Sequence, residues 1–418
     1  MQHDDLLFIG MCDISGHVRG KTVPARERDN RLRQGIGWTP TSVMISTLGP
    51  IWDSPFGTAG DLALIPDPST EVSLPTAPDG TTQHWMLGGL HHPDGRPWDC
   101  CPRQALTQAI ADLEAAGLTL RVGFEHEFHY SGGGSFPGSP YSLRALREQD
   151  GFGSALVGLL SRNGLEPDTF LAEYGDRQFE TTLAPAPPLQ AADRAVLLRE
   201  LARSCAHACG ERVSFSPMPH PDGAGNGFHT HFSLWDRQGN PLTAGDDPHL
   251  GLSRMMGAFC AGIQSQMAAL CALVAPTPVS YLRLTPNRWA PTMADIARQE
   301  RGAALRICPV FAGGSRHELQ SNVEFRIPDG AANPYLVLTG LIRAGLYGLQ
   351  QELIPALDQA PALPTSLTAA LDALEASPLV NHLAPRLLEA YLRAKRAEAE
   401  ANRDLDPHDL CDRYRNVF

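Results

Sequence analysis

The chain has 418 residues, of which 43% are hydrophobic, so it is long enough for more than one domain and a large buried core. Its formal net charge is −12 and no basic run occurs, which excludes a broad nucleic-acid-binding surface because phosphate contacts need clustered Lys and Arg. The nine cysteines are scattered and form no Cys-x-x-Cys pair, so we expect free thiols and a cytoplasmic protein.

Residues 6–100 are predicted to be rich in strands and turns. Leu7–Met11 is a candidate strand, Asp13–Gly16 a turn and 18–23 the return strand of a hairpin, and Asp61–Pro68 contains a further short strand. The segment Gly16–Thr22 is similar to a phosphate-binding loop. Its spacing is one residue short and no helix pattern follows it, so we reject it as a nucleotide site.

A domain boundary is expected near residue 100, which divides the chain into 1–100 and 101–418. Pro102 begins a helix whose apolar stripe includes Leu106 and Leu113 and which Gly117 ends. Helix patterns then alternate with strands, which predicts an α+β domain rather than a doubly wound sheet. The patterns cover 190–209, 250–275, 334–354, 366–376 and 380–402.

The stretch Met255–Ala275 has no charged residue and is only moderately apolar. It contains Gln264, Ser265 and Gln266 within its length. We interpret it as a helix packed inside a large domain rather than as a membrane span.

The segment Arg121–Tyr130 alternates with the period of a strand. Phe124 and Phe128 fall on an apolar face, while Glu125 and Glu127 fall on the opposite face, about 7 Å apart by strand rise. Two like charges on a buried strand repel, and a bound cation relieves the repulsion. The alternative is a half-exposed strand whose acids face water.

The same pattern of acids or histidines on apolar strands recurs three times. Glu173 and Glu180 flank a turn, His229 and His231 follow Gly225-Asn-Gly227, and Glu324 lies between apolar residues. Five carboxylates with an imidazole form a hard ligand set, suited to two or three Mg²⁺ or Mn²⁺ ions rather than to structural zinc. The alternative for the two histidines is a buried pair with satisfied hydrogen bonds.

Several arginines accompany these acids, namely Arg283, Arg301, Arg306 and Arg326. Metals with several arginines in one pocket are typical of phosphoryl transfer, in which charge neutralisation supplies most of the catalysis. Arg301 and Arg306 alone would more often be surface charges.

These ordered motifs resemble the glutamine synthetase superfamily over nearly all of the chain. Residues 8–24 and 60–70 resemble its N-terminal β-grasp domain, and the acidic strands resemble its metal-binding motifs. The resemblance implies that one metal is held by Glu127, Glu173 and Glu180, and the second by Glu125, His229 and Glu324. It implies that His231, Ser233 and Arg306 lie on the nucleotide side. It also implies that Gly225, Arg283 and Arg326 bind the carboxylate substrate. Arg301, Arg306 and Glu324 would act at the transferred phosphate.

The resemblance also implies an activity and an assembly. ATP phosphorylates the γ-carboxylate of glutamate, and an amine then displaces phosphate to give an amide. Family members form stacked hexameric rings with active sites between subunits, so we expect a homo-oligomer.

Two departures from the family pattern concern the amine. Trp289 stands where glutamine synthetases place a Glu before Ala-Pro, and the loop Gly37–Ser42 has no acid where they bring in an Asp. Binding ammonium and removing its proton calls for carboxylates, whereas Trp offers an apolar wall. We therefore expect an amine larger than ammonia; the alternative is that Trp289 only packs its loop.

Other departures concern the acid substrate and leave strict glutamate specificity open. They are Ala224, Leu282, Glu300 and the pair Asp176-Arg177.

The leading hypothesis is an ATP-dependent γ-glutamyl–amine ligase. The alternatives are an ammonia-using glutamine synthetase, a non-catalytic ring-forming scaffold or sensor, and a phosphagen-type kinase, which lacks this N-terminal domain.

Overall fold

The computed structural model describes residues 5–75, 82–149, 151–311, 317–358 and 360–418. Its N-terminal part is a six-stranded sheet in the order β2-β1-β6-β4-β3, with β5 paired to β6. The only parallel pair among these described strands is β1 with β6. The strands are β1 (Leu6–Cys12), β2 (Val18–Pro24), β3 (Ile36–Trp38), β4 (Leu62–Pro66), β5 (Val72–Pro75) and β6 (Thr82–His91), and α1 (Arg28–Gln34) packs on β4.

The predicted N-terminal hairpin is confirmed. Leu7 pairs with Val23 and Cys12 with Val18 in an antiparallel register. The segment Gly16–Thr22 is therefore the hairpin turn and most of β2. A 3-10 helix begins only at Ala25 and α1 at Arg28, so the segment does not lead directly into a helix as a phosphate-binding loop does.

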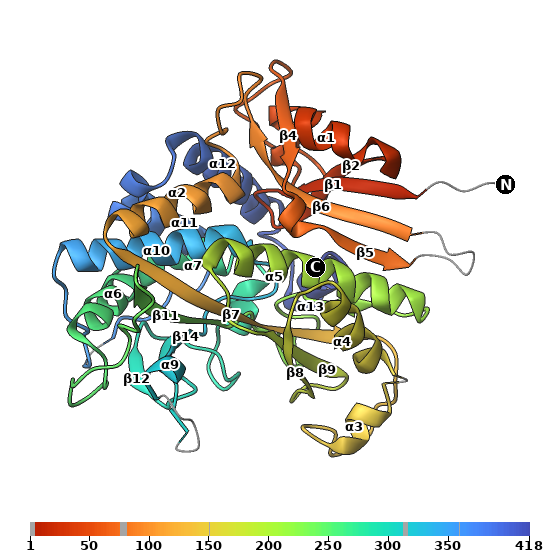
Figure 1. Ribbon diagram of the computed structural model, residues 1–418. Helices are drawn as coiled ribbons and strands as arrows, with labels where there is room; N and C mark the ends of the chain where they lie inside the picture. The colour runs from red at the N-terminus through yellow and green to blue at the C-terminus, as the bar shows by residue number, and fades with distance from the viewer. Residues whose placement is uncertain (1–4, 76–81, 150, 312–316, 359) are drawn as a thin grey trace.

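The larger sheet has eight strands in the order β12-β13-β14-β11-β7-β9-β8, with β10 paired to β7. Its longest strand, β7, crosses the middle of the molecule in Figure 1. The strands are β7 (Leu118–Tyr130), β8 (Pro167–Ala172), β9 (Gln178–Leu183), β10 (Val213–Ser214), β11 (Thr230–Asp236), β12 (Ile296–Arg298), β13 (Leu305–Ile307) and β14 (Val323–Phe325).

Helices cover the apolar face of this sheet and separate it from the N-terminal sheet (Figure 1). Two helices, α2 (Pro102–Ala115) and α5 (Pro188–Ala208), pack on β7. A third, α10 (Pro334–Gln350), contacts both of these helices. Asn333 caps α10 by accepting the backbone N–H of Tyr335 at 2.9 Å, and its amide donates to Asp13 O at 2.7 Å. The helix layer is thus tied to the N-terminal hairpin.

The remaining helices lie around the sheet or toward the end of the chain. They are α3 (Leu143–Arg147), α4 (Phe152–Arg162), α6 (Arg254–Ser265), α7 (Met267–Val274), α8 (Ser280–Arg283), α9 (His317–Gln320), α11 (Leu367–Ala376), α12 (Pro385–Ala401) and α13 (Pro407–Tyr414). The mixture of two sheets with surrounding helices confirms the predicted α+β class. All nine cysteines are free thiols, as predicted.

The single helix predicted over 250–275 is wrong. The chain forms two helices, α6 and α7, which meet at Gln266 and are bent by 74°. Most of both helices is buried, as the sequence predicted. Together the two bent helices have the length and apolar composition of a membrane span. No single helix in the described part of the chain is long and apolar enough to cross a membrane.

α6 and α10 approach each other closely where both carry glycine. A Cβ on Gly262 would lie 2.1 Å from Ala344 O, and one on Gly348 would lie 2.1 Å from Ala258 O. No side chain fits at either position, so the backbones of the two helices touch there.

Candidate active site

The acids of β7 lie on the face of the sheet opposite the helices, as strand alternation predicts. Val122, Phe124 and Phe128 are buried, and Glu125 and Glu127 are half-buried on the other face. The chain just before β11 also runs beside β7. Glu125 N donates to His229 O at 3.0 Å, which brings the imidazole to the acid face.

A row of paired residues crosses four neighbouring strands. His231 on β11 pairs with Gly123 on β7 and with Glu324 on β14, and Glu324 pairs with Arg306 on β13. Residues in one row project from the same face of a sheet. The register therefore gathers the side chains of His231, Arg306 and Glu324, which lie up to 93 positions apart in the sequence.

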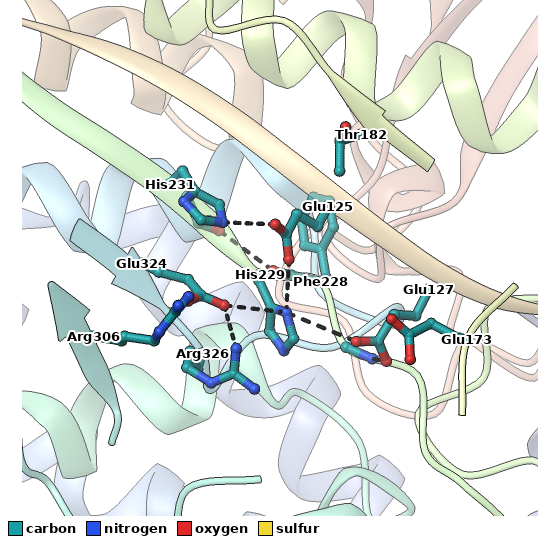
Figure 2. A network of polar contacts seen from close by, with 12 residues as sticks. Glu125, Glu127, Glu173, Thr182, Phe228, His229, His231, Arg306, Glu324 and Arg326 are labelled. Atoms are coloured by element: carbon teal, nitrogen blue, oxygen red, sulfur yellow. Dashed lines mark hydrogen bonds and ion pairs between the residues drawn. The ribbon is translucent and has the colours of Figure 1, made fainter. Parts of the chain in front are cut away.

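His229 lies at the centre of the acidic cluster (Figure 2). Its Nδ1 is 3.1 Å from Glu125 Oε2, 3.5 Å from Glu324 Oε1 and 3.8 Å from Glu127 Oε1. One ligand atom each from Glu125, His229 and Glu324 lies within 4.8 Å of the other two. Three such groups converging on one point would hold a divalent ion.

Two arginines hold the buried carboxylate of Glu324. Arg306 Nη1 donates to its Oε2 at 2.6 Å, and Arg326 Nη1 donates to its Oε1. Burial opposes ionisation, but the charges of His229, Arg326 and His231 outweigh it and lower the pKa of Glu324. Glu324 is therefore a charged acid deep in the site.

A second group of acids lies at the other end of the cluster. Glu127 and Glu180 are direct partners on β7 and β9, and Glu173 follows β8. Burial and the carboxylates of Glu125, Glu127 and Glu173 raise the pKa of Glu180 to about 10. Burial and Glu127 also raise the pKa of Glu173. A cation bound there would restore the charged form of both acids, so the residues fit a divalent ion.

His231 connects Glu125 to a groove of about 530 Å³. Its Nε2 is 2.9 Å from Glu125 Oε1, and its Nδ1 is 2.8 Å from Asn322 Oδ1. Burial opposes ionisation of Glu125, but bonds from His229 and His231 hold the pKa of its carboxyl well below its usual range. Ser233 lines the same groove and accepts a hydrogen bond from Trp235 Nε1 at 2.8 Å.

Arg283 is buried behind His229. Its Nη1 donates to Ile327 O at 2.9 Å, and its Nη2 is 3.2 Å from Arg326 O and 3.4 Å from His229 Nε2. Gly225 permits this approach, because a Cβ there would lie 2.9 Å from Arg283 Cγ. Arg283 thus fixes the orientation of the imidazole.

Two of the predicted residues lie apart from the cluster. Arg301 is exposed on the turn between β12 and β13, and within the described ranges it makes no hydrogen bond or ion pair with the acids. Trp289 is exposed on the loop 284–295, although its carbonyl accepts a hydrogen bond from Arg326 Nη2 at 3.4 Å. The other predicted site residues are in the cluster or in contact with it, except Ser233, which lines the groove beside it.

Sequence reasoning missed residues that hold the acids in place. Gly227 N donates to Glu127 Oε2 at 2.6 Å, and a Cβ on Gly227 would lie 2.6 Å from His229 Nε2. Tyr141 donates to Glu173 Oε2 at 2.9 Å from a distant loop. Gly227 is part of the glycine spacing noted before His229, although its bond to Glu127 was not predicted, whereas no local pattern points to Tyr141.

The chain is similar to known proteins in both sequence and fold. Residues 1–98 match the model described as the glutamine synthetase N-terminal domain, and residues 99–412 match its catalytic domain. The gamma-glutamylpolyamine synthetase GlnA3 of Streptomyces coelicolor is 32% identical over 98% of this chain and 92% of its own length. A solved structure described as a novel glutamine synthase homolog is 37% identical, with a TM-score of 0.95 over 100% of this chain and 99% of that one. The structure of GmaS in complex with ADP is 30% identical and covers 96% and 95% of the two chains with a TM-score of 0.82.

Proposed function

The chain belongs to the glutamine synthetase family, whose members are ATP-dependent ligases that form C–N bonds, and we propose that it joins L-glutamate to an organic amine through the γ-carboxylate. The observation that carries this proposal is Trp289, an exposed aromatic side chain at the position where an ammonia-using enzyme presents a carboxylate. Its similarity to a gamma-glutamylpolyamine synthetase supports an organic amine as the acceptor.

We propose two metal positions within the acidic cluster. Glu127, Glu173 and Glu180 would hold one ion and Glu125, His229 and Glu324 the other, with two or three Mg²⁺ or Mn²⁺ ions per site. Bound ions would neutralise the phosphate oxygens of ATP and the surplus negative charge of the acids. The pairing of Glu127 with Glu180 on neighbouring strands supports this assignment.

The substrates would occupy the two sides of the cluster. Arg283, Arg326 and Gly225 are proposed at the carboxylate substrate, and Trp289 at the amine. His231, Ser233 and Arg306 are proposed on the nucleotide side, where the groove lined by His231 and Ser233 opens.

The reaction would proceed in two displacement steps. An oxygen of the glutamate γ-carboxylate bonds to the γ-phosphorus of ATP while the bond to ADP breaks. The amine nitrogen then bonds to the acyl carbon, the C–O bond to phosphate breaks, and the nitrogen loses a proton. Arg306 lies in the same row as Glu324 and His231 and would stabilise charge on the transferred phosphate, as proposed also for Arg301.

The proposed assembly is a homo-oligomer of stacked hexameric rings, with domains at 1–100 and 101–418. Its mass in solution, measured by light scattering after size exclusion, tests this. A monomer would contradict it.

An amine panel tests the proposed function. Phosphate release from ATP is measured with ammonium, methylamine, longer alkyl amines and polyamines, with and without L-glutamate and Mg²⁺. We expect release that depends on glutamate, Mg²⁺ and an organic amine. Equal turnover with ammonium would support an ammonia-using synthetase instead, and phosphate retained on the product would indicate a kinase.

A further inference from the structure

Two exposed aromatic side chains stack on each other beside the acidic cluster. The ring centroids of Tyr174 and Trp289 are 6.5 Å apart, and their planes are inclined by 24°. Tyr174 is on the turn between β8 and β9, and Trp289 is on the loop between α8 and β12. Their exposed fractions are 66% and 70%, so much of both rings has no contact within the chain. Apolar area of this kind, held in a fixed arrangement, is suited to a ligand.

The backbone attaches this aromatic pair to both ends of the cluster. Tyr174 N donates to Glu173 Oε2 at 2.8 Å. Trp289 O accepts from Arg326 Nη2 at 3.4 Å, and Arg326 also binds Glu324. The aromatic pair therefore extends from Glu173, which precedes Tyr174, to Arg326, which binds the buried Glu324.

The loop holds the indole outward in an uncommon backbone conformation. Asn287 has φ 66°, which Asn tolerates, and Trp289 has φ 55°, a left-handed value that is uncommon for a bulky side chain. Arg288 fixes the loop between them by donating to Gly223 O at 2.9 Å and to Pro221 O. The exposed position of Trp289 is thus imposed by its surroundings.

Glu173 and the two aromatic faces favour a positively charged ligand with an apolar part, whereas the other charges on the turn of Tyr174 pair with each other. Glu173 precedes Tyr174 directly, and Arg177 lies 3.5 Å from Asp176 in an ion pair on the same turn. Aromatic faces attract ammonium groups and also pack against methylene groups.

We propose that Tyr174 and Trp289 clamp the methylene chain of the acceptor amine, and that Tyr174 is a specificity-determining residue. This inference rests on the proposed function, because it requires an organic amine as acceptor. The ligand class is a primary aliphatic amine with several methylene groups, whose reacting nitrogen points toward the acidic cluster.

The test compares ammonium, methylamine, butylamine and hexylamine as acceptors, with kcat and KM measured separately. In Tyr174→Ala we expect KM for hexylamine to rise about tenfold, with kcat little changed and methylamine unaffected, because the lost contact is with the chain. Tyr174→Phe keeps the ring and should behave as wild type. Ile354→Ala, which truncates another exposed apolar side chain on the loop after α10, should also behave as wild type.

Two outcomes would overturn the inference in different ways. If wild type prefers hexylamine and Tyr174→Ala keeps the same preference and KM, the clamp is wrong while the proposed function stands. If wild type uses ammonium as well as it uses every amine, the proposed function fails and the clamp fails with it.

Discussion

Glu127 and Glu180 lie directly opposite each other on the antiparallel strands β7 and β9. Like charges at such a pair destabilise a sheet. Glu180 is buried, and among the described residues no basic side chain forms an ion pair with it. The metal-free sheet therefore avoids the repulsion by keeping Glu180 protonated, and a bound divalent ion would remove this cost in stability.

Glu180→Gln should raise the melting temperature of the protein in EDTA, because it removes one of the two facing acids. It should also reduce the stabilisation by Mg²⁺, which for wild type is about 2.7 kcal/mol at an ion concentration a hundred times Kd. Thermal denaturation with EDTA, Mg²⁺ and Mn²⁺ measures both effects. Glu114→Gln, on the exposed side of α2, is the control, and an equal Mg²⁺ gain in Glu180→Gln would contradict the metal assignment.

Arg306→Ala should lower kcat by about a hundredfold or more, since Arg306 is proposed to stabilise charge on the transferred phosphate. The fold should persist, because Arg326 still pairs with Glu324. Steady-state kinetics and the melting temperature separate the two effects. Arg298→Ala, an exposed arginine on the neighbouring strand β12, should leave kcat unchanged. A similar kcat in both variants would remove Arg306 from the mechanism.

Trp289→Glu should shift acceptor preference toward ammonium. A carboxylate there would attract the ammonium ion and accept its proton, and an interaction of about 1.4 kcal/mol would change the ratio of kcat/KM for ammonium to that for hexylamine about tenfold. Trp289→Phe has the same backbone requirement and keeps an apolar ring, so its ratio should stay near that of wild type. Equal ratios in the two variants would show that this position does not select the amine.

His17 should make the protein less stable in acid. It is half-buried and stacks on Phe418 with ring centroids 5.1 Å apart. Burial, followed by the charges of Arg203 and Arg19, lowers the pKa of His17 to about 3. The unfolded chain therefore binds a proton that the folded chain does not, so stability falls by about 1.4 kcal/mol per pH unit as pH drops below about 6.5.

His17→Phe keeps the stacked ring and should lose this part of the pH dependence. Urea denaturation at pH 7, 6 and 5 measures the difference in unfolding free energy between the two proteins. Burial raises the pKa of the adjacent Asp13 to about 6, which has the opposite sign, but Asp13 is present in both proteins and largely cancels in the comparison. Parallel pH profiles would contradict the prediction.

Strand alternation predicted which face of β7 carries Glu125 and Glu127, because the side-chain period of a strand is fixed by its geometry. The register between strands could not be predicted in the same way. Whether Glu127 faces Glu180 or a neutral neighbour depends on pairing between segments joined by long connections. The juxtaposition of Glu127 and Glu180 was therefore visible only in the folded chain.

Other features depend on contacts with no local signal. The stack of Tyr174 on Trp289 joins residues more than a hundred positions apart, and Tyr174 by itself looks like an ordinary turn residue. Hydropathy alone gave one helix over 250–275, because both α6 and α7 are apolar, and it could not show the bend at Gln266. The exposed position of Arg301 likewise follows from its turn rather than from its sequence motif.

The backbone contact between Gly262 and Gly348 constrains how this enzyme could be changed by evolution or engineering. Any added methyl group there would push α10 away from α6 and disturb α2, α5 and α7, which α10 also contacts. The scaffold beneath the acids is consequently intolerant of small adjustments. New acceptor preferences should arise instead on the surface loops that carry Tyr174 and Trp289, where substitutions leave the helix layer undisturbed.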